Sequence, residues 1–340
     1  MLPGEEAEVA RVGRRAFQGL ESLMVGKPKK AMVAVSDNQI VGAIVYRFLG
    51  SGKNKIGYVD LAFVDREYHD RGVGAVLYRE SIDFLWQQGC TAVTALVKDD
   101  NIGSWSLFMR YGLKRVDMIT ACRYLGPLGI LRNLLLTPFV IADGMEFYLA
   151  VKEAKIPEKK GGVTQILLYI LLNVLLFLPA FFMRDVQEEL AAVRAYLTLL
   201  CAGTLAGLLV TTFHSRSWSF RMNNGGMLLT ILLNMSGGAF PMIGNWYPKR
   251  YEKTISFRRD MGLCALAEWL TVLLLTAVPY LAGLDGPYFE ALTQFGCIFL
   301  IYRILAFYPF ESFGGRRVLN WNKGIYGIMA AVSAVLIWKC

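Results

Sequence analysis

Histidine and closely spaced cysteines are almost absent from this sequence of 340 residues. The two histidines, His69 and His214, are far apart, and the six cysteines are scattered without a single C-x-x-C pair. Zinc ribbons and disulfide frameworks need clustered cysteines, so neither is expected here. A catalytic zinc needs about three protein ligands, which two distant histidines do not supply.

The start of the chain lacks the apolar run of a secretory signal. Its first residues, MLPGEEAEVARVGRR, are strongly charged, so we expect no signal peptide and a first domain on the cytoplasmic side. Runs of lysine and arginine with interleaved aromatic residues are also missing. Nucleic acid is therefore not an expected partner, despite the formal net charge of +9.

Charged residues are scarce in the second half of the chain. Residues 1–160 hold 22 of the 36 Lys and Arg and 18 of the 27 Asp and Glu, whereas residues 161–340 hold 14 and 9. Apolar residues make up 55% of the chain, and the mean hydropathy is +0.40. These values predict a globular domain (1–152), a linker (153–163) and a membrane domain (164–340), with the lipid bilayer as a partner.

Alternating helices and strands predict an α/β fold for the first domain. Its opening helix, 5–24, places Val9, Val12, Phe17 and Leu20 along one side. Apolar runs bounded by turn residues then predict six strands and two more helices. The strands are expected at 30–35, 39–49, 55–64, 91–97, 113–125 and 146–152, and the helices at 72–86 and 101–111.

The apolar stretch 127–142, PLGILRNLLLTPFVIA, interrupts the last pair of strands. It is too short for a reliable membrane span. We expect it to be either a packed insertion helix or a helix that lies on the membrane surface.

Several apolar runs beyond the linker are long enough to cross a bilayer. A further run, 226–247, contains GGAFPMIG, which is unsuited to a simple spanning helix. If 226–247 is re-entrant, the basic loops lie inside and the acidic loops RDVQEEL and GLDGPYFE lie outside, as the positive-inside bias requires. We therefore expect an all-α, multi-pass domain of five or six membrane helices with a re-entrant segment. The five spanning runs are 164–183, 195–213, 261–283, 291–309 and 324–338.

The segment VDLAFVDREYHDRGVGAVLYRESIDFL joins a strand, a glycine-containing turn and a helix. Gly72 and Gly74 allow the backbone to approach a ligand closely. The first N–H groups of the helix then point at that ligand, and the helix dipole favours an anion. The turn that begins at His69 is therefore a predicted pyrophosphate cradle.

This segment resembles the GNAT acetyltransferase superfamily, whose Q/R-x-x-G-x-G/A signature is matched by HDRGVG except at His69. Downstream, Asn101-x-x-Ser104 and the helix end at Tyr111-Gly112-Leu113 are similar to the family's N-x-x-A…Y-x-x-x-G-F helix. The resemblance covers about 5–152.

The resemblance implies a mixed, mostly antiparallel central sheet flanked by helices. It also implies acetyl-CoA as co-substrate and an amine as acceptor. The cofactor-binding residues that it implies are Ala62, Phe63 and Val64 for the pantetheine arm, His69, Asp70, Arg71, Gly72, Val73, Gly74 and Ala75 for the pyrophosphate, and Asn101 and Phe108.

Amine attack on a thioester needs a base for the ammonium proton and an acid for the leaving thiolate. Asp60, on the strand beside the cofactor, is the candidate base, and the alternative is an ordinary exposed or hydrogen-bonded strand residue. His69 is either a base or a phosphate ligand. The resemblance places the family's tyrosine acid at Phe108, which cannot donate a proton, so Tyr111 is the remaining candidate acid.

Three segments of the membrane domain, LVTTFHSRSW, NMSGGAFP and FYPFESFGGRRVLNWNK, resemble the intramembrane site-two protease family. That family binds zinc through H-E-x-x-H and the Asp of an L-D-G turn. Here His214 keeps the first ligand position, while Ser215, Trp218 and Gly314 replace the base, the second His and the Asp. We expect an inactive relative of the protease without a metal, and the alternative is an unrelated helical bundle.

Two ionisable residues, Glu268 and Arg303, lie inside expected membrane spans. Such residues are functional candidates by default. The alternatives are a structural pair between them, or an arginine whose long side chain reaches the membrane surface.

The sequence thus predicts a membrane-anchored N-acetyltransferase that moves an acetyl group from acetyl-CoA to an amine of a protein, a lipid headgroup or a small molecule. The alternative function is a non-catalytic acyl-CoA sensor coupled to the membrane domain, which Phe108 at the tyrosine position favours. A surviving intramembrane protease is disfavoured by the missing zinc ligands.

Overall fold

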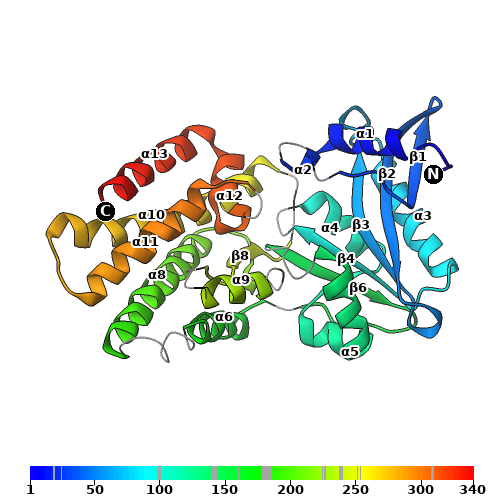
Figure 1. The fold of residues 1–340 in the computed structure, drawn as a ribbon. Coiled ribbons are helices and arrows are strands. Elements are labelled where there is room, and N and C mark those ends of the chain that lie inside the picture. The colour runs from blue at the N-terminus through cyan, green and yellow to red at the C-terminus, as the bar shows by residue number, and fades with distance from the viewer. Residues whose placement is uncertain are drawn as a thin grey trace. The chain divides into compact units, whose positions relative to one another are not determined.

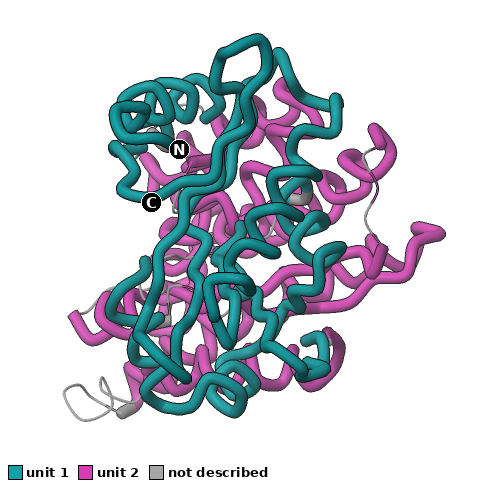
Figure 2. The backbone as a smooth tube through the Cα atoms, turned by 90° about the vertical axis from the view of Figure 1, so that its right-hand side faces the viewer, with its two compact units in different colours: residues 1–159 teal, residues 160–340 magenta. Residues whose placement is uncertain are grey.

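Figure 1 shows the fold of the chain, a computed structural model of all 340 residues. The structure describes the chain except for residues 18–19, 24, 99–100, 139–143, 160, 178–185, 224, 226, 237–239, 251, 253 and 308–309. The chain forms two compact units, unit 1 (Met1–Lys159) and unit 2 (Lys160–Cys340), which Figure 2 colours separately. Each unit has a hydrophobic core of its own.

A six-stranded sheet forms the centre of unit 1. Its strands are β1 (Ala31–Ser36), β2 (Gln39–Leu49), β3 (Ile56–Val64), β4 (Ala92–Lys98), β5 (Lys114–Val116) and β6 (Met145–Val151). Their order across the sheet is β1-β2-β3-β4-β6-β5, and all neighbours are antiparallel except β3 and β4, which are parallel. The predicted mixed, mostly antiparallel sheet is confirmed.

The expected opening helix is divided into α1 (Glu6–Ala16) and the short α2 (Leu20–Leu23). Val9 and Val12 are buried in the core beneath α1, as their spacing predicts. Phe17 already has an extended backbone and ends α1. The side chain of Leu20, which the sequence placed on the same side, lies outside the described part of the chain.

Helices cover both faces of the sheet. α3 (Val73–Gln87) and α4 (Ile102–Arg110) pack on one face, whereas α1 and α5 (Met118–Leu136) pack on the other. Successive residues of β6 show the alternation, because Tyr148 belongs to the core under α3 and α4 and Phe147 to the core under α5.

The expectation of a strand over 113–125 is wrong beyond β5. The chain turns at Asp117, whose Oδ1 accepts a hydrogen bond from the Thr120 N–H at 2.7 Å and so caps the start of α5. α5 then kinks at Gly126, where φ is +69°, and restarts at Pro127. The expected insertion 127–142 is helical as far as α5 extends, and its last residues fall in the undescribed segment 139–143.

Unit 2 is mainly helical, but it is not all-α as expected. A two-stranded antiparallel ribbon of β7 (Trp218–Met222) and β8 (Gly244–Pro248) accompanies the helices. Most of 226–247 is therefore divided between a nine-residue helix and a strand, and it is no continuous spanning helix. The helices are α6 (Val163–Leu175), α8 (Val186–Thr212), α9 (Met227–Met235), α10 (Ile255–Ala282), α11 (Pro287–Ile304), α12 (Gly315–Trp321) and α13 (Lys323–Lys339).

Among the described residues, two helices are long and apolar enough to cross a membrane, Gln187–Thr212 and Ile255–Ala282. These correspond to two of the five expected spans. α6 is apolar but shorter. A multi-pass topology therefore stays a prediction.

Unit 2 has apolar side chains both in its core and on its outer surface, and a few polar side chains are buried among the core residues. Asn173, Thr276 and Ser333 are fully buried, and the Trp269 Nε1 donates a hydrogen bond to the Ser333 hydroxyl at 3.0 Å. A helix on the surface of a water-soluble protein has a polar outer face, whereas the long helices of unit 2 also carry leucines and valines on theirs. The exposed apolar residues of the long helices include Leu167, Leu171, Leu205, Leu209, Leu274, Leu281, Val332 and Val335.

Candidate functional site

A gap opens in the centre of the unit 1 sheet, between the two parallel strands. β3 and β4 pair only from Ile56 to Val59 and from Ala92 to Ala95. Beyond these residues, β3 pairs with β2 and β4 pairs with β6, each on its far side. The facing backbone edges of residues 60–64 and 96–98 can therefore hydrogen-bond to an extended ligand, as an added strand would.

The gap begins at a β-bulge. On β2, Tyr46 pairs with Val59 and Val45 pairs with Leu61, so Asp60 is the extra residue between them. A bulge bends its strand and increases the local twist. The bulge thus coincides with the point at which β3 leaves β4, and it places Asp60 at the entrance to the gap.

The predicted cradle follows directly after β3. Gly72 has φ +81° and caps the N-terminus of α3 without a side-chain hydrogen bond. A Cβ atom at Gly72 would meet no atom within 4 Å, so the space in front of the helix is open. The backbone N–H groups of the first turn, including Val73 and Gly74, therefore have the geometry of an anion site.

Some side chains around the cradle stabilise the turn itself and are therefore less available to a ligand. The His69 Nε2 lies 3.0 Å from the Val64 carbonyl oxygen, to which it donates, so the ring holds the turn against the end of β3. The Arg71 guanidinium lies over the Tyr68 ring at 5.1 Å and is exposed. These contacts favour Arg71 over His69 as the side chain available to a phosphate.

Asn101 performs a capping role at the start of α4. Its Oδ1 accepts a hydrogen bond from the Ser104 N–H at 3.2 Å. The helix therefore begins at a fixed residue beside the end of β4. A Cβ atom at Gly74 would lie 3.6 Å from Leu107, which shows that the first turn of α3 packs closely on α4.

The candidate base Asp60 is engaged in an ion pair. Its carboxylate accepts from the Arg47 guanidinium at 2.6 and 2.9 Å, and Arg47 also donates to the Leu136 carbonyl at the end of α5. The hydrogen bond to Asp60 raises the pKa of Arg47, although burial acts in the opposite direction. The pair lies on the α1–α5 face of the sheet, opposite the cradle.

The structure brings Phe108 into the core rather than to a cofactor surface. Its side chain is 2% exposed and packs edge-on against Tyr78 at 4.7 Å and beside Tyr148 at 6.3 Å. The expected contact of Phe108 with the cofactor stays a prediction, and in this structure its side chain packs in the core. Tyr111 caps the C-terminus of α4, where it is half-buried at the far end of the helix from Asn101.

Sequence reasoning missed Tyr78. Its hydroxyl is buried without a hydrogen-bond partner in the part of the chain that the structure describes. Burial raises its pKa to about 12, and Ser104 on α4 opposes this shift. The sequence did contain a signal for Tyr78. It lies one helical turn after Gly74, on the buried side of the helix, where an apolar residue without a hydroxyl would pack equally well.

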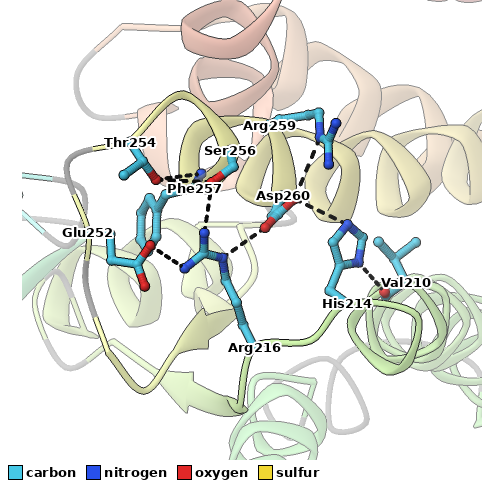
Figure 3. Close-up of polar contacts among 9 residues, drawn as sticks. All are labelled: Val210, His214, Arg216, Glu252, Thr254, Ser256, Phe257, Arg259 and Asp260. Atoms are coloured by element: carbon cyan, nitrogen blue, oxygen red, sulfur yellow. Dashed lines mark hydrogen bonds and ion pairs between the residues drawn. The ribbon is translucent and has the colours of Figure 1, made fainter.

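The candidate zinc ligand of unit 2 belongs to a chain of ion pairs (Figure 3). The His214 Nδ1 lies 2.7 Å from the Val210 carbonyl, and its Nε2 lies 3.3 Å from the Asp260 carboxylate. Asp260 also accepts from Arg216 at 2.8 Å, which in turn pairs with Glu252 at 2.8 Å. No group of three potential metal ligands occurs among the residues described.

The other two ionisable candidates line one cavity of unit 2. Glu268 and Arg303 both face it, together with Asn245. Arg303 donates to the Phe299 carbonyl at 3.1 Å, and the Cys264 thiol donates to Glu268 at 3.9 Å. The expected direct pair between Glu268 and Arg303 is absent from the ion pairs of the described residues.

Comparison with known proteins assigns unit 1. Residues 7–113 match the model of the acetyltransferase (GNAT) family, a range that includes the gap, the cradle and α4. No curated protein matches the chain. Unit 1 therefore contains a domain that matches the GNAT acetyltransferase family, and this match supports acetyl transfer from acetyl-CoA to an amine.

Solved structures similar to the chain include the ribosomal-protein-S18-alanine N-acetyltransferase from Escherichia coli, at 10% identity, 46% coverage of this chain, 96% of that chain and a TM-score of 0.31. The PaiA N-acetyltransferase from Thermoplasma acidophilum, in complex with coenzyme A, is similar at 12% identity, 43% and 92% coverage and a TM-score of 0.32. These scores carry no argument of their own. The assignment rests on the family match.

Replacement of Gly72 by glutamate tests the cradle. The new carboxylate would stand where phosphates approach the helix, so we expect acetyl-CoA affinity to fall by about 100-fold or more, measured by calorimetry. Gly89→Glu is the matched control, because Gly89 follows the other end of α3, has φ +76° and is equally open. Equal affinity in both variants would contradict the assignment.

Proposed function

We propose that the chain is a membrane-anchored N-acetyltransferase, in which unit 1 acetylates an amine and unit 2 fixes the enzyme to a bilayer. The gap between β3 and β4 carries the proposal, because it opens beside an unblocked helix N-terminus within a domain matched by the GNAT family. In this pose the pantetheine arm lies along the backbone of Ala62, Phe63 and Val64. The pyrophosphate lies at the 69–75 turn, and Asn101 borders the cofactor.

In this pose the acetyl donor and the acceptor amine approach from opposite faces of the sheet. The donor enters on the α3–α4 side, and the acceptor amine approaches from the α1–α5 side, where Asp60 and Arg47 lie. Attack on the thioester requires loss of an ammonium proton, which Asp60 accepts directly or through water. The contact with Arg47 holds the Asp60 carboxylate in one position on the acceptor side of the sheet.

The membrane assignment of unit 2 is supported by its exposed apolar residues. α8 and α10 are long and apolar enough to span, and their exposed residues include Leu205, Leu209, Leu274 and Leu281. Non-helical backbone at membrane depth is tolerated where other parts of the protein shield it. We propose that this holds for β8 within 226–247. We propose a multi-pass domain with 226–247 re-entrant and unit 1 on the cytoplasmic side.

The proposed relation of unit 2 to an inactive site-two protease rests on the sequence resemblance alone. His214 follows the end of α8 and contacts Asp260, while Trp218 begins a strand. Two ligands on one helical turn would be needed for the H-E-x-x-H geometry. The His214 region is therefore proposed to be structural, and no zinc is required.

A second candidate function is an acyl-CoA sensor without turnover. The observation that favours it is Phe108, which is buried in the core where relatives carry a tyrosine donor. A sensor would bind acetyl-CoA through the same gap. Turnover separates the two functions.

Purified chain should transfer label from acetyl-CoA to at least one amine of a panel. If Asp60 is the base, Asp60→Asn lowers kcat by about 100-fold or more, since general-base catalysis contributes 10²–10⁴. The affinity for acetyl-CoA should be unchanged. Arg11→Gln, an exposed substitution on α1, is the control and should retain activity. Tight binding of acetyl-CoA with no turnover on any amine would favour the sensor.

Cysteine labelling tests the topology. In a background without native cysteines, Asp285→Cys, between α10 and α11, should react with an impermeant maleimide added outside intact cells. Arg250→Cys, before α10, should react only after permeabilisation, because the positive-inside bias keeps basic loops in the cytoplasm. Strong labelling of Arg250→Cys from outside would mean that 226–247 spans the membrane.

A further inference from the structure

The second segment of α5 (127–136) carries a row of exposed leucines on its outer side. Leu128, Leu131 and Leu135 follow one another at helical spacing and are 53%, 48% and 71% exposed. Asn133 on the opposite side is 1% exposed, and its Oδ1 accepts a hydrogen bond from the Thr94 hydroxyl of β4 at 3.1 Å. Asn133 thus faces the sheet together with Ile130, which is buried in the core beneath α5, and the three leucines face away from it.

Positive charge borders this leucine face. The sequence of α5 contains no acidic residue, and it includes Arg123, which is exposed, and Arg132. Arg132 donates to the Asn54 carbonyl, in the turn that also carries Lys53 and Lys55. A leucine face with a basic border is the composition of helices that lie in the interface of an anionic bilayer.

The leucine face ends beside the acceptor side of the site. The last carbonyl of α5, that of Leu136, accepts from the Arg47 guanidinium at 3.2 Å, and Arg47 pairs with Asp60. Leu136 itself is 52% exposed. A surface that covers the leucine face therefore comes close to the candidate base.

We infer that α5 lies in the interfacial layer of the bilayer, with Leu128, Leu131 and Leu135 toward the acyl chains and the basic residues at the headgroups. The inference rests on the proposed function and names its acceptor class, an amine presented at the membrane surface. A bilayer fits better than a second copy of the chain, because basic residues on both copies would meet across a two-fold contact.

Depth-dependent quenching in vesicles of phosphatidylcholine and phosphatidylglycerol tests the inference on the full chain without native cysteines. A fluorophore on Leu131→Cys should be quenched several-fold more by lipids that carry a spin label near the headgroup than one on Val76→Cys. Val76 is the matched control, since it is 53% exposed but lies on α3, across the sheet. Equal quenching at both positions, or shielding of position 131 from both lipid and aqueous quenchers, overturns the inference.

A second arm separates this inference from the proposed function. Leu131→Glu/Leu135→Glu should lower transfer to an aminophospholipid headgroup or a bilayer-anchored amine, while transfer to a soluble amine is retained. Val35→Glu, at another exposed apolar position of unit 1, should change neither. If the unsubstituted protein is inactive on every amine, the proposed function is contradicted. If the unsubstituted protein is active and the double variant loses equal activity on soluble and anchored amines, only the membrane contact is contradicted.

A separate observation concerns the leaving thiolate. The Tyr78 hydroxyl is buried between α3 and α4 on the donor side of the sheet. It makes no hydrogen bond of ordinary geometry among the described residues, although the Ser104 side chain lies close enough to lower its pKa. The Tyr78 ring contacts Phe108, the position at which the family signature has its tyrosine. A buried hydroxyl that lacks a partner costs free energy, unless a ligand supplies one.

We propose that Tyr78 donates a hydrogen bond to the sulfur of coenzyme A as the C–S bond breaks, in the role left open by Phe108. The amine nitrogen forms the new C–N bond, the electron pair of the C–S bond moves to sulfur, and the proton removed from the amine reaches the thiolate through solvent. Tyr78 keeps its proton throughout. This proposal also rests on unit 1 being an active transferase.

Tyr78→Phe should lower kcat at least tenfold with unchanged acetyl-CoA affinity, and Tyr78→Phe/Phe108→Tyr should recover activity. The loss should shrink for an acetyl thioester of a more acidic thiol, because its thiolate needs less stabilisation. Tyr148→Phe, the buried tyrosine on the other side of Phe108, should retain kcat. A loss that is independent of the leaving thiol, or equal in Tyr148→Phe, refutes the role.

Discussion

Backbone pairing between β3 and β4 stops after four residues in each strand, and the arrangement of unit 1 follows from that interruption. Unpaired N–H and C=O groups inside a sheet are costly unless a ligand or water pairs with them. The bulge at Asp60 bends β3 away from β4, and Gly72 turns the chain into α3. Asn101 starts α4 after β4, on the other side of the gap. Each of these devices keeps the gap open while the outer strands remain fully paired.

The features that the sequence revealed are local. HDRGVG and the capping Asn101 are short patterns whose conformation depends on neighbouring residues, and the strand alternation identified most of the sheet. Contacts between distant segments could not be predicted in this way. The pair of Arg47 with Asp60, the burial of Phe108 against Tyr78 and the contact of His214 with Asp260 all depend on tertiary packing. The strand expected over 113–125 failed because the cap at Asp117 outweighed the apolar pattern.

Exposed leucines are a feature that α5 shares with the long helices of unit 2, although they belong to different units. Buried polar side chains behind them are paired, Asn133 with Thr94 and Ser333 with Trp269. Burial of such leucines away from water is favourable. If both regions contact a bilayer as proposed, the membrane rather than a pocket would restrict the choice of acceptor.

The open N-terminus of α3 has a consequence for regulation. In the proposed pose, this cradle and the backbone edge of β3 contact the pyrophosphate and the pantetheine arm, which are identical in acetyl-CoA and in free coenzyme A. Binding energy of that kind favours substrate and product equally. The enzyme would then be subject to competitive product inhibition, and its rate in the cell would follow the ratio of acetyl-CoA to coenzyme A rather than the concentration of acetyl-CoA alone.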